Sequence, residues 1–262
     1  HRRRDRMIIT KNDREIATMR RAGEVVAEMK AAVRAALRPG VSTADLDKAA
    51  AQVVEARGAT ASFLGYRGFP ATICASINDE IVHGIPSPDR ILQDGDLFKG
   101  DFGAIVDGFH ADSAFTLPVG EVSDELMKLI ETTERALWAG IAEVRPGNRM
   151  GDIGHAIQTV AEGAGFSVVR EYVGHGIGRA LHEDPPVPNY GTPGKGVALK
   201  AGMVIAIEPM VNVGTYETRL MPDKWTVKTA DGAMSAHFEH TIAITEAGPW
   251  VLTDPDQPEP PR

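Results

Sequence analysis

Two aspartates near the middle of the chain have the spacing of a paired site for a cation. Strand-like apolar runs flank Asp107-Gly108, a dipeptide typical of the two-residue turn between antiparallel strands. This turn makes Asp101 and Asp112 diagonal neighbours on one face of a hairpin, roughly 7–8 Å apart at the backbone. Two carboxylates that face each other repel unless a cation lies between them. The hairpin therefore favours metal binding over the ordinary alternative, a pair of solvated aspartates.

Two glutamates in the second half of the chain have similar surroundings. Glu208 ends the apolar run 203–207, and a carboxylate in such a strand is costly to bury unless it is paired or coordinated. Glu239 lies in the strand-like segment 235–245, on a face that it shares by alternation with His237. Both glutamates are therefore candidate ligands.

One histidine stands out by its neighbours. His175 lies in the glycine-rich segment 174–178, where the missing side chains let the backbone approach other groups closely. The segment lacks the Gly-x-Gly-x-x-Gly spacing of a dinucleotide-binding turn, so we exclude that function. A lone histidine is more often a hydrogen-bonding residue than a ligand. We assign that ordinary role to four others: His1, His110, His155 and His237.

Two aspartates, two glutamates and one imidazole form a hard, oxygen-rich donor set. Such a set suits divalent manganese, iron, cobalt or zinc. Four carboxylates carry enough negative charge to balance two of these ions. Paired ions ~3.5–4 Å apart bridge a water that ionises near neutral pH, which is the chemistry of a hydrolase.

An internal repeat indicates how the chain brings these residues together. Arg38-Pro39-Gly40 recurs 107 residues later as Arg145-Pro146-Gly147, and at the same offset Asp101 falls on Glu208. Each half shows two helical patterns followed by strands, which predicts an α+β domain with pseudo-twofold symmetry and a site between the halves. The expected half-repeats are 13–117 and 120–245. If Glu239 is the counterpart of Asp112, the second hairpin carries about twenty extra residues, enough for a loop that includes Trp225.

The predicted helix starts agree with a division of the chain into two equivalent halves. Asn12 with Glu15 three residues later forms a capping box for a first helix, and Ser123 can cap its counterpart in the second half.

Composition excludes several other classes of protein. The 262 residues are 43% hydrophobic and 24% charged, with a net charge of −8, which argues against disorder and against a binder of nucleic-acid phosphates. The single cysteine excludes an internal disulfide and a cysteine-rich zinc site. No apolar run is long enough to span a bilayer. We expect a soluble cytoplasmic protein.

The domain boundaries follow from the two ends. Residues 1–6 are basic without an apolar segment behind them, so they predict a native extension or a cloning remnant rather than a secretory signal. Residues 254–262 are rich in proline and predict a flexible tail. A single catalytic domain is expected over 7–253.

Five segments of the sequence together resemble the type I methionine aminopeptidases, and the match extends from about residue 7 to 253. The segments are 74–86 (CASINDEIVHGIP), 107–112 (DGFHAD), 174–178 (GHGIG), 207–210 (IEPM) and 238–241 (FEHT). This resemblance implies the pita-bread fold of the creatinase and aminopeptidase superfamily, an internally duplicated antiparallel sheet flanked by helices. It also implies removal of the N-terminal methionine from nascent polypeptides, with a small second residue preferred.

The resemblance assigns roles to individual residues. The implied ligands of two divalent ions are Asp101, Asp112, His175, Glu208 and Glu239, and a water between the ions is the nucleophile. His83 is implied to contact the substrate near its N-terminus, and His182 to bind the scissile peptide and stabilise the tetrahedral intermediate. Glu208 would act as the base. The implied methionine pocket consists of Tyr66, Phe69, Cys74 and Trp225. A monomer with possible contact to the ribosome is expected.

Four positions depart from the family pattern. Lys99 and Gly100 precede the ligand Asp101, where a cation would compete with a metal or lie just outside the site, and a glycine could loosen the strand. Leu181 replaces a more typical phenylalanine, and Phe63 replaces a smaller residue near the pocket.

Two alternative functions remain compatible with the sequence. A proline-directed peptidase of the same fold uses the same kinds of ligand but usually carries an additional N-terminal domain. A non-enzymatic binding protein on the same scaffold is the other, although such relatives typically lose metal ligands.

Overall fold

The computed structural model describes residues 7–261, so the predicted N-terminal extension 1–6 lies outside the described residues. The described part contains four α-helices, which are α1 (Asp13–Ala36), α2 (Thr43–Ala56), α3 (Asp124–Ala142) and α4 (Met150–Gly163). A short 3-10 helix, η1, spans Tyr66–Gly68. The strands are β1 (Thr60–Ala61), β2 (Cys74–Ile77), β3 (Glu80–Val82), β4 (Leu97–Val106), β5 (Phe109–Pro118), β6 (Ser167–Val168), β7 (Gly174–Gly176), β8 (Glu183–Val187), β9 (Val204–Ile207), β10 (Met210–Asn212), β11 (Thr218–Leu220), β12 (Val227–Thr229), β13 (Ser235–His237), β14 (His240–Thr245) and β15 (Gly248–Val251).

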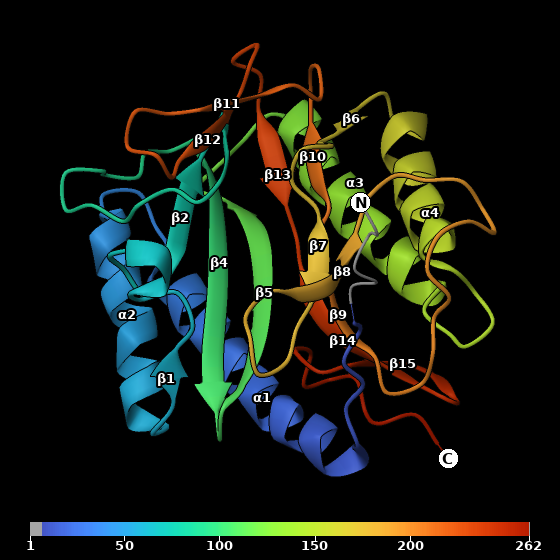
Figure 1. The fold of residues 1–262 in the computed structure, drawn as a ribbon. Coiled ribbons are helices and arrows are strands. Elements are labelled where there is room, and N and C mark those ends of the chain that lie inside the picture. The colour runs from blue at the N-terminus through green and yellow to red at the C-terminus, as the bar shows by residue number, and fades with distance from the viewer. Residues whose placement is uncertain (1–6, 262) are drawn as a thin grey trace.

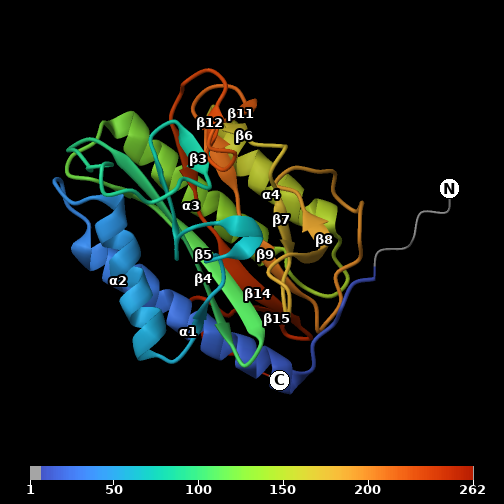
Figure 2. The ribbon, with the colours of Figure 1, turned by 60° about the vertical axis from the view of Figure 1, so that its left-hand side comes forward.

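The strands form antiparallel sheets in the middle of the molecule, with the helices packed against them (Figures 1 and 2). In the first half, β4 pairs with β5 on one side and with β1 and β2 on the other. In the second half, β9 pairs with β14 and β7, while β10 pairs with β13 and β6. Helix α1 contacts β4 and β5, and α3 contacts β13 and β10. Each pair of helices therefore covers the strands of its own half.

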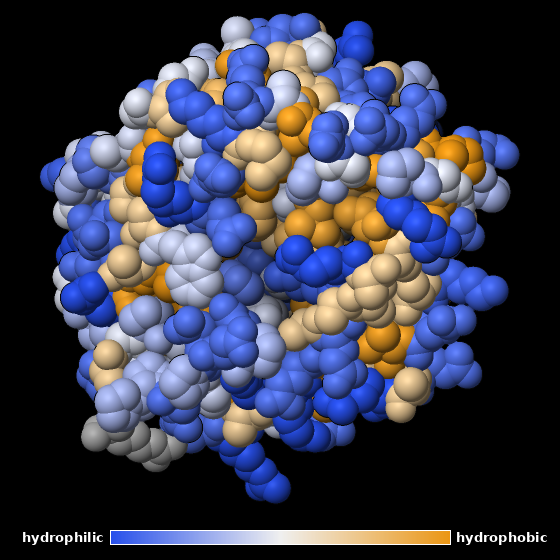
Figure 3. Space-filling model, turned by 180° about the vertical axis from the view of Figure 1, so that it is seen from behind, coloured by the Kyte–Doolittle hydropathy of each residue, from blue (hydrophilic) through white to orange (hydrophobic). Residues whose placement is uncertain are grey.

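The helices are amphipathic and bury one apolar stripe each. In α1, side chains such as Met19, Val26 and Met29 are fully buried against the sheet. The face opposite that of Figure 1 is covered largely by hydrophilic side chains, with apolar residues in smaller groups among them (Figure 3). None of the helices in the described part of the chain is long and apolar enough to cross a membrane.

The predicted internal duplication is confirmed by the element boundaries. Helix α2 (43–56) and helix α4 (150–163) begin and end 107 residues apart, as do β1 (60–61) and β6 (167–168). Even an isolated bridge repeats, since Ser42 pairs with Ile91 and Arg149 pairs with Ala198. The two halves are thus copies of one structural unit.

Both predicted helix caps are present. The Asn12 side chain accepts a hydrogen bond from the Glu15 N–H at 2.8 Å, and the Glu15 carboxylate accepts from the Asn12 N–H at 3.1 Å. Ser123 accepts from the Leu126 N–H at 3.3 Å at the start of α3. These contacts satisfy backbone N–H groups that have no partner within the helix.

The predicted hairpin has the register that its turn requires. Asp107 and Gly108 both have positive φ, 47° and 82°, as a type I′ turn demands. Asp101 pairs with Ala114, and Gly103 pairs with Asp112. The two aspartates are therefore diagonal neighbours on one face, as the sequence predicts.

The prediction of a single strand over 235–245 is wrong. The chain is divided there into β13, which pairs with β10, and β14, which pairs with β9, and Phe238 and Glu239 separate them. The interruption lies opposite Glu208 and Pro209, where proline has no N–H to donate to the ladder. Glu239 instead exchanges backbone hydrogen bonds with Ala114 of β5, at 3.0 and 3.1 Å. This bridge joins the two halves.

The register also corrects the expected equivalence of Glu239 with Asp112. Gly103 pairs with Asp112, and its equivalent at the 107-residue offset, Met210, pairs with His237. The counterpart of Asp112 is therefore His237, and the counterpart of Ala114 is Glu239. The extra residues of the second half include β11, β12 and Trp225 between them, which agrees with the predicted loop.

The C-terminal segment, whose flexibility stays a prediction, begins against α1. Arg20 of α1 donates hydrogen bonds from its guanidinium to the backbone oxygens of Asp254 and Pro255, at 3.0 and 3.3 Å.

Candidate metal centre

The fold brings all five predicted ligands together where the two halves of the chain meet, a region called the seam below. They lie in two overlapping groups, within each of which the potential ligand atoms are all within 4.8 Å of one another. The first group, called group A below, contains Asp112, His175 and Glu239. The second, group B, contains Asp101, Glu208, His237 and Glu239. Glu239 belongs to both groups, so the arrangement suits two neighbouring ions that share a carboxylate.

The imidazole of His175 is oriented by its own backbone. Its Nδ1 lies 2.8 Å from the carbonyl oxygen of Gly176, so Nδ1 carries the proton that this bond needs. Its Nε2 then faces the Asp112 and Glu239 carboxylates, at 3.3 and 3.8 Å. Burial opposes a charged ring here, but the charge of Asp112 and the hydrogen bond with it raise the pKa of His175 to about 9. The carboxylates thus attract a positive charge to this position.

The carboxylates themselves are buried or half-buried next to like charges. Burial, together with the charges of Glu208 and Asp112, raises the pKa of Asp101 well above its ordinary value. Burial and the charges of Asp112 and Glu208 do the same for Glu239. Glu208 differs: burial would raise its pKa, but the neighbouring side chains of His237 and Glu239 and the charge of His175 lower it to about 2. These buried acids need a compensating cation or retained protons.

The lack of hydrogen-bond partners for several ligand atoms is a second observation that fits a pair of divalent ions. Within residues 7–261, three buried carboxylate oxygens have no hydrogen-bond partner, namely Oδ1 of Asp101 and both carboxylate oxygens of Glu239. Buried polar atoms normally have partners because desolvation is costly. Oxygen atoms that are buried, unpaired and convergent are what a hard or borderline divalent ion requires.

Glycines beside His175 let its strand approach its neighbours. A Cβ on Gly174 would lie 2.1 Å from the backbone oxygen of Ala206 in β9, and one on Gly176 would lie 2.2 Å from that of Asp184. A backbone oxygen cannot move aside without separating the strands. The glycine-rich segment therefore positions the histidine between two strands of the sheet.

We expect Gly174→Ala to destabilise the protein by about 1–3 kcal/mol, because β7 and β9 must move apart to admit the methyl group. Urea unfolding followed by circular dichroism measures the change. Gly163→Ala is the matched control, since Gly163 ends α4 and its Cβ would meet nothing within 4 Å. Equal stability of the two variants would contradict this account of the segment.

Lys99 lies outside the groups of potential ligands. Its ammonium donates hydrogen bonds to the backbone oxygens of Asn78 and Ser235, at 2.7 and 2.9 Å. Burial lowers the pKa of Lys99 to about 7, although nearby acids, Glu80 first among them, oppose this shift. Because Asn78 and Ser235 belong to different halves, Lys99 links the halves instead of occupying a metal position. At Gly100, a Cβ would meet the ring of Phe102 at 2.6 Å, so the space of a side chain is already filled.

A cavity of about 170 Å³ opens next to the metal centre. The four predicted pocket residues line it together with Phe63, Arg67, His83, Asp101, Asp112, His175, Leu181, His182 and Glu208. Phe69 and Trp225 meet edge to face at 5.1 Å. Burial raises the pKa of the Cys74 thiol well above its usual value, so this wall stays uncharged.

The two histidines implied by the resemblance also border this cavity. The hydroxyl of Tyr66 lies 2.8 Å from Nδ1 of His182, and the rings of His182 and His175 are 4.3 Å apart. Burial and the neighbouring His175 lower the pKa of His182 to about 4, so His182 is neutral at physiological pH. His83 packs edge to face on Tyr172 at 5.9 Å, and burial lowers its pKa as well.

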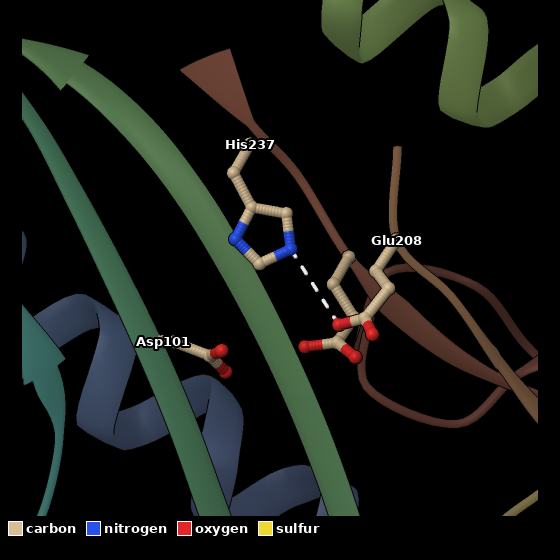
Figure 4. A group of neighbouring side chains, drawn as sticks. Asp101, Glu208 and His237 are labelled. Carbon is tan, nitrogen blue, oxygen red and sulfur yellow. Dashed lines mark ion pairs between the residues drawn. The ribbon is translucent and has the colours of Figure 1, made fainter. Parts of the chain in front are cut away.

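His237 is the site residue that sequence reasoning assigned to an ordinary role. Its side chain lies with Asp101 and Glu208 around a common space, and its Nε2 is 3.5 Å from Oε2 of Glu208 (Figure 4). Alternation with Glu239 was the signal that could have found it. Arg67 was also missed; it lies in η1 with its guanidinium over the Tyr66 ring, and nothing in the sequence pattern points to it. His110, by contrast, pairs with the Ser62 hydroxyl at 2.9 Å, as an ordinary buried histidine does.

Comparison with known proteins agrees with this geometry. Residues 17–246 match metallopeptidase family M24. Methionine aminopeptidase 1 of Bacillus subtilis is 53% identical over 247 residues, which cover 94% of this chain and 99% of that protein. The crystal structure of methionine aminopeptidase from Rickettsia prowazekii has a TM-score of 0.93 at 42% identity, covering 95% of this chain and 100% of that chain.

A more distant structure shows how widely the architecture is shared. The prolidase from Pyrococcus furiosus has a TM-score of 0.72 at 21% identity, covering 94% of this chain and 65% of that chain, which shows the common pita-bread fold alone. Both the predicted fold and the predicted resemblance are confirmed. The chain therefore belongs to metallopeptidase family M24 and, within it, to the methionine aminopeptidases.

Proposed function

We propose that this protein hydrolyses the first peptide bond of polypeptides that begin with methionine and have a small second residue. Membership of the methionine aminopeptidases supports the reaction. The single observation that carries the proposal is the shared cavity, in which carboxylates of the metal centre and an apolar wall of Tyr66, Phe69, Cys74 and Trp225 line one small space. A flexible thioether side chain fits an aromatic-lined pocket of this size.

Five residues would hold the ions: Asp101, Asp112, His175, Glu208 and Glu239. Bound divalent ions, for which we propose manganese, iron, cobalt or zinc, supply Lewis acidity and a water that is acidic enough to lose a proton near neutral pH. Group A and group B overlap at Glu239, which supports two adjacent positions. The two half-repeats 13–117 and 120–245 thus contribute to one catalytic domain, 7–253.

Glu208 has the protonation state of a general base. With its pKa lowered to about 2, its carboxylate is ionised throughout the physiological range. It borders the cavity, where it can accept the proton of the attacking water and later deliver it to the amine of the departing chain.

His182 is placed to stabilise the developing oxyanion. When the Tyr66 hydroxyl donates to Nδ1, the neutral ring carries its proton on Nε2 and can donate it to the substrate carbonyl oxygen. His83, on the same cavity, is proposed to contact the substrate near its N-terminus.

A comparison of substrates tests the proposal. We expect the metal-loaded protein to release methionine from Met-Ala-Ser and to leave a Gly-Pro or Ala-Pro dipeptide uncut, with amino-acid release measured by chromatography. Preferential cleavage of the proline dipeptides would identify a proline-directed peptidase instead, and no cleavage of either would identify a binding protein. The 53% identity with a methionine aminopeptidase, against 21% with a prolidase, favours the first outcome.

We further propose that the protein acts in the cytoplasm, as a monomer, on nascent chains at the ribosome. The nature of the substrate supports this setting, because a free methionyl N-terminus first appears during translation. Cosedimentation of the protein with purified ribosomes and its mass by light scattering test the two parts of this proposal separately.

A further inference from the structure

His237 occupies a position that resembles that of a ligand more than that of a structural histidine. It ends β13, is 1% exposed, and lies in group B with Asp101, Glu208 and Glu239. Its ring points toward Glu208 across the space that Asp101 faces from the other side (Figure 4).

The distance between Nε2 of His237 and the carboxylate of Glu208 suits two ligands of one ion. Nε2 of His237 lies 3.5 Å from Oε2 of Glu208, longer than an ordinary N–H···O hydrogen bond. Two atoms that bind a tetrahedral ion at ~2.0–2.2 Å lie about 3.4 Å apart. In group A, His175 and Asp112 show almost the same separation, 3.3 Å. Each group thus contains one imidazole and one carboxylate at this spacing.

The pseudo-twofold symmetry places His237 where the first half has a ligand. His237 is the counterpart of Asp112, since Asp112 pairs with Gly103 and His237 pairs with Met210. The backbones of both residues are held in the same way. The Thr241 hydroxyl accepts from the Asp112 N–H at 3.0 Å and donates to the Asp112 carbonyl oxygen at 2.7 Å.

The equivalent contacts to His237 come from Thr116. The Thr116 hydroxyl accepts from the His237 N–H and donates to the His237 carbonyl oxygen, both at 2.8 Å. Thr241 and Thr116 therefore hold the backbones of Asp112 and His237 in the same way. The side chains of Asp112 and His237 lie at equivalent positions on either side of the seam.

The nitrogen of His237 also has an unmet bonding requirement. Its Nε2 is buried without a hydrogen-bond partner. Six buried side-chain atoms in the described residues share this state, and four of them are in group B: Asp101 Oδ1, both Glu239 oxygens and His237 Nε2. Such a concentration is costly unless a common partner satisfies all four atoms.

We propose that His237 is a metal ligand, donating Nε2 to the ion held by Asp101, Glu208 and Glu239, so that each ion position has its own histidine. This inference rests on the metal centre of the proposed function and adds a sixth protein ligand to it. The additional nitrogen makes group B more selective for cobalt, zinc and iron over magnesium and calcium, which prefer oxygen.

Cobalt binding to His237→Gln tests the assignment. Glutamine keeps an N–H that can donate to Glu208 but cannot replace an imidazole ligand. We expect calorimetric titration to show two Co²⁺ sites in the wild-type protein, and the affinity of one of them to fall about tenfold or more in the variant. His155→Gln is the control, because His155 is exposed on α4 and belongs to neither group.

X-ray absorption of the cobalt-loaded proteins gives a second readout. With two ions bound, imidazole scattering should correspond to one ring per cobalt in the wild type and to half of that in His237→Gln. Unchanged affinity and unchanged scattering in a variant with a normal melting temperature would overturn the ligand assignment and leave His237 as a hydrogen-bonding neighbour of Glu208. These measurements do not depend on turnover, so they stand whether or not Met-Ala-Ser is cleaved.

Discussion

Glu208→Gln is expected to lower kcat for Met-Ala-Ser by ~10³-fold or more while the protein remains folded. Glutamine has nearly the same shape as glutamate but can neither accept the proton of the attacking water nor supply negative charge to an ion. Because Glu208 lies at the end of β9 next to the cavity, no packing is lost by the change. Initial rates at saturating Met-Ala-Ser and Co²⁺ measure the effect, and the melting temperature confirms the fold.

The control for this variant is Glu217→Gln. Glu217 is exposed and lies beside β11, so removing its charge should leave kcat unchanged. If Glu208→Gln retains more than a few per cent of the wild-type rate, another residue must act as the base.

Removal of divalent ions is expected to abolish hydrolysis and to lower the melting temperature. An ion present at 100 times its Kd stabilises the folded protein by ~2.7 kcal/mol, which corresponds to roughly 5–10 °C for a chain of this size. The physical reason is the mutual repulsion of four carboxylates, which an ion removes; Asp112 and Glu239 are buried, and Asp101 and Glu208 are half-buried. Calorimetry after dialysis against a chelator, with and without added Co²⁺ or Mn²⁺, measures both effects.

Restoration provides the control for the chelation experiment. Activity and melting temperature should return together as the ion is added back, and calcium should restore less than cobalt because the centre contains imidazole. Hydrolysis that persists in the presence of chelator would contradict a metal-dependent reaction.

Much of the fold could be predicted because it depends on local patterns. The turn at Asp107-Gly108 sets the register of β4 and β5, and a period-2 register then determines which aspartates share a face. The capping box at Asn12 and the repeat of the Arg-Pro-Gly segments likewise need only short stretches of sequence. These predictions are confirmed without any knowledge of how the halves meet.

Contacts across the seam could not be predicted in the same way. The interruption at Phe238 and Glu239 arises because Glu239 leaves its own sheet to bond Ala114, a partner 125 residues away in the chain. The role of Lys99 depends on the carbonyl of Ser235, and that of His182 on the hydroxyl of Tyr66. Each of these contacts joins residues of the two halves. Periodicity in the sequence does not show how the halves pack against each other, so it could not predict these contacts.

The bridge between Ala114 and Glu239 has a consequence for the origin of the site. The two residues are counterparts that pair with each other, so a local symmetry axis passes between them. In a homodimer of identical half-length chains, a residue on such an axis meets its own copy. Two glutamates there would repel, and two alanines would offer no ligand. In a fused chain the copies mutate independently, so one carboxylate can lie on the axis and be shared by both ions.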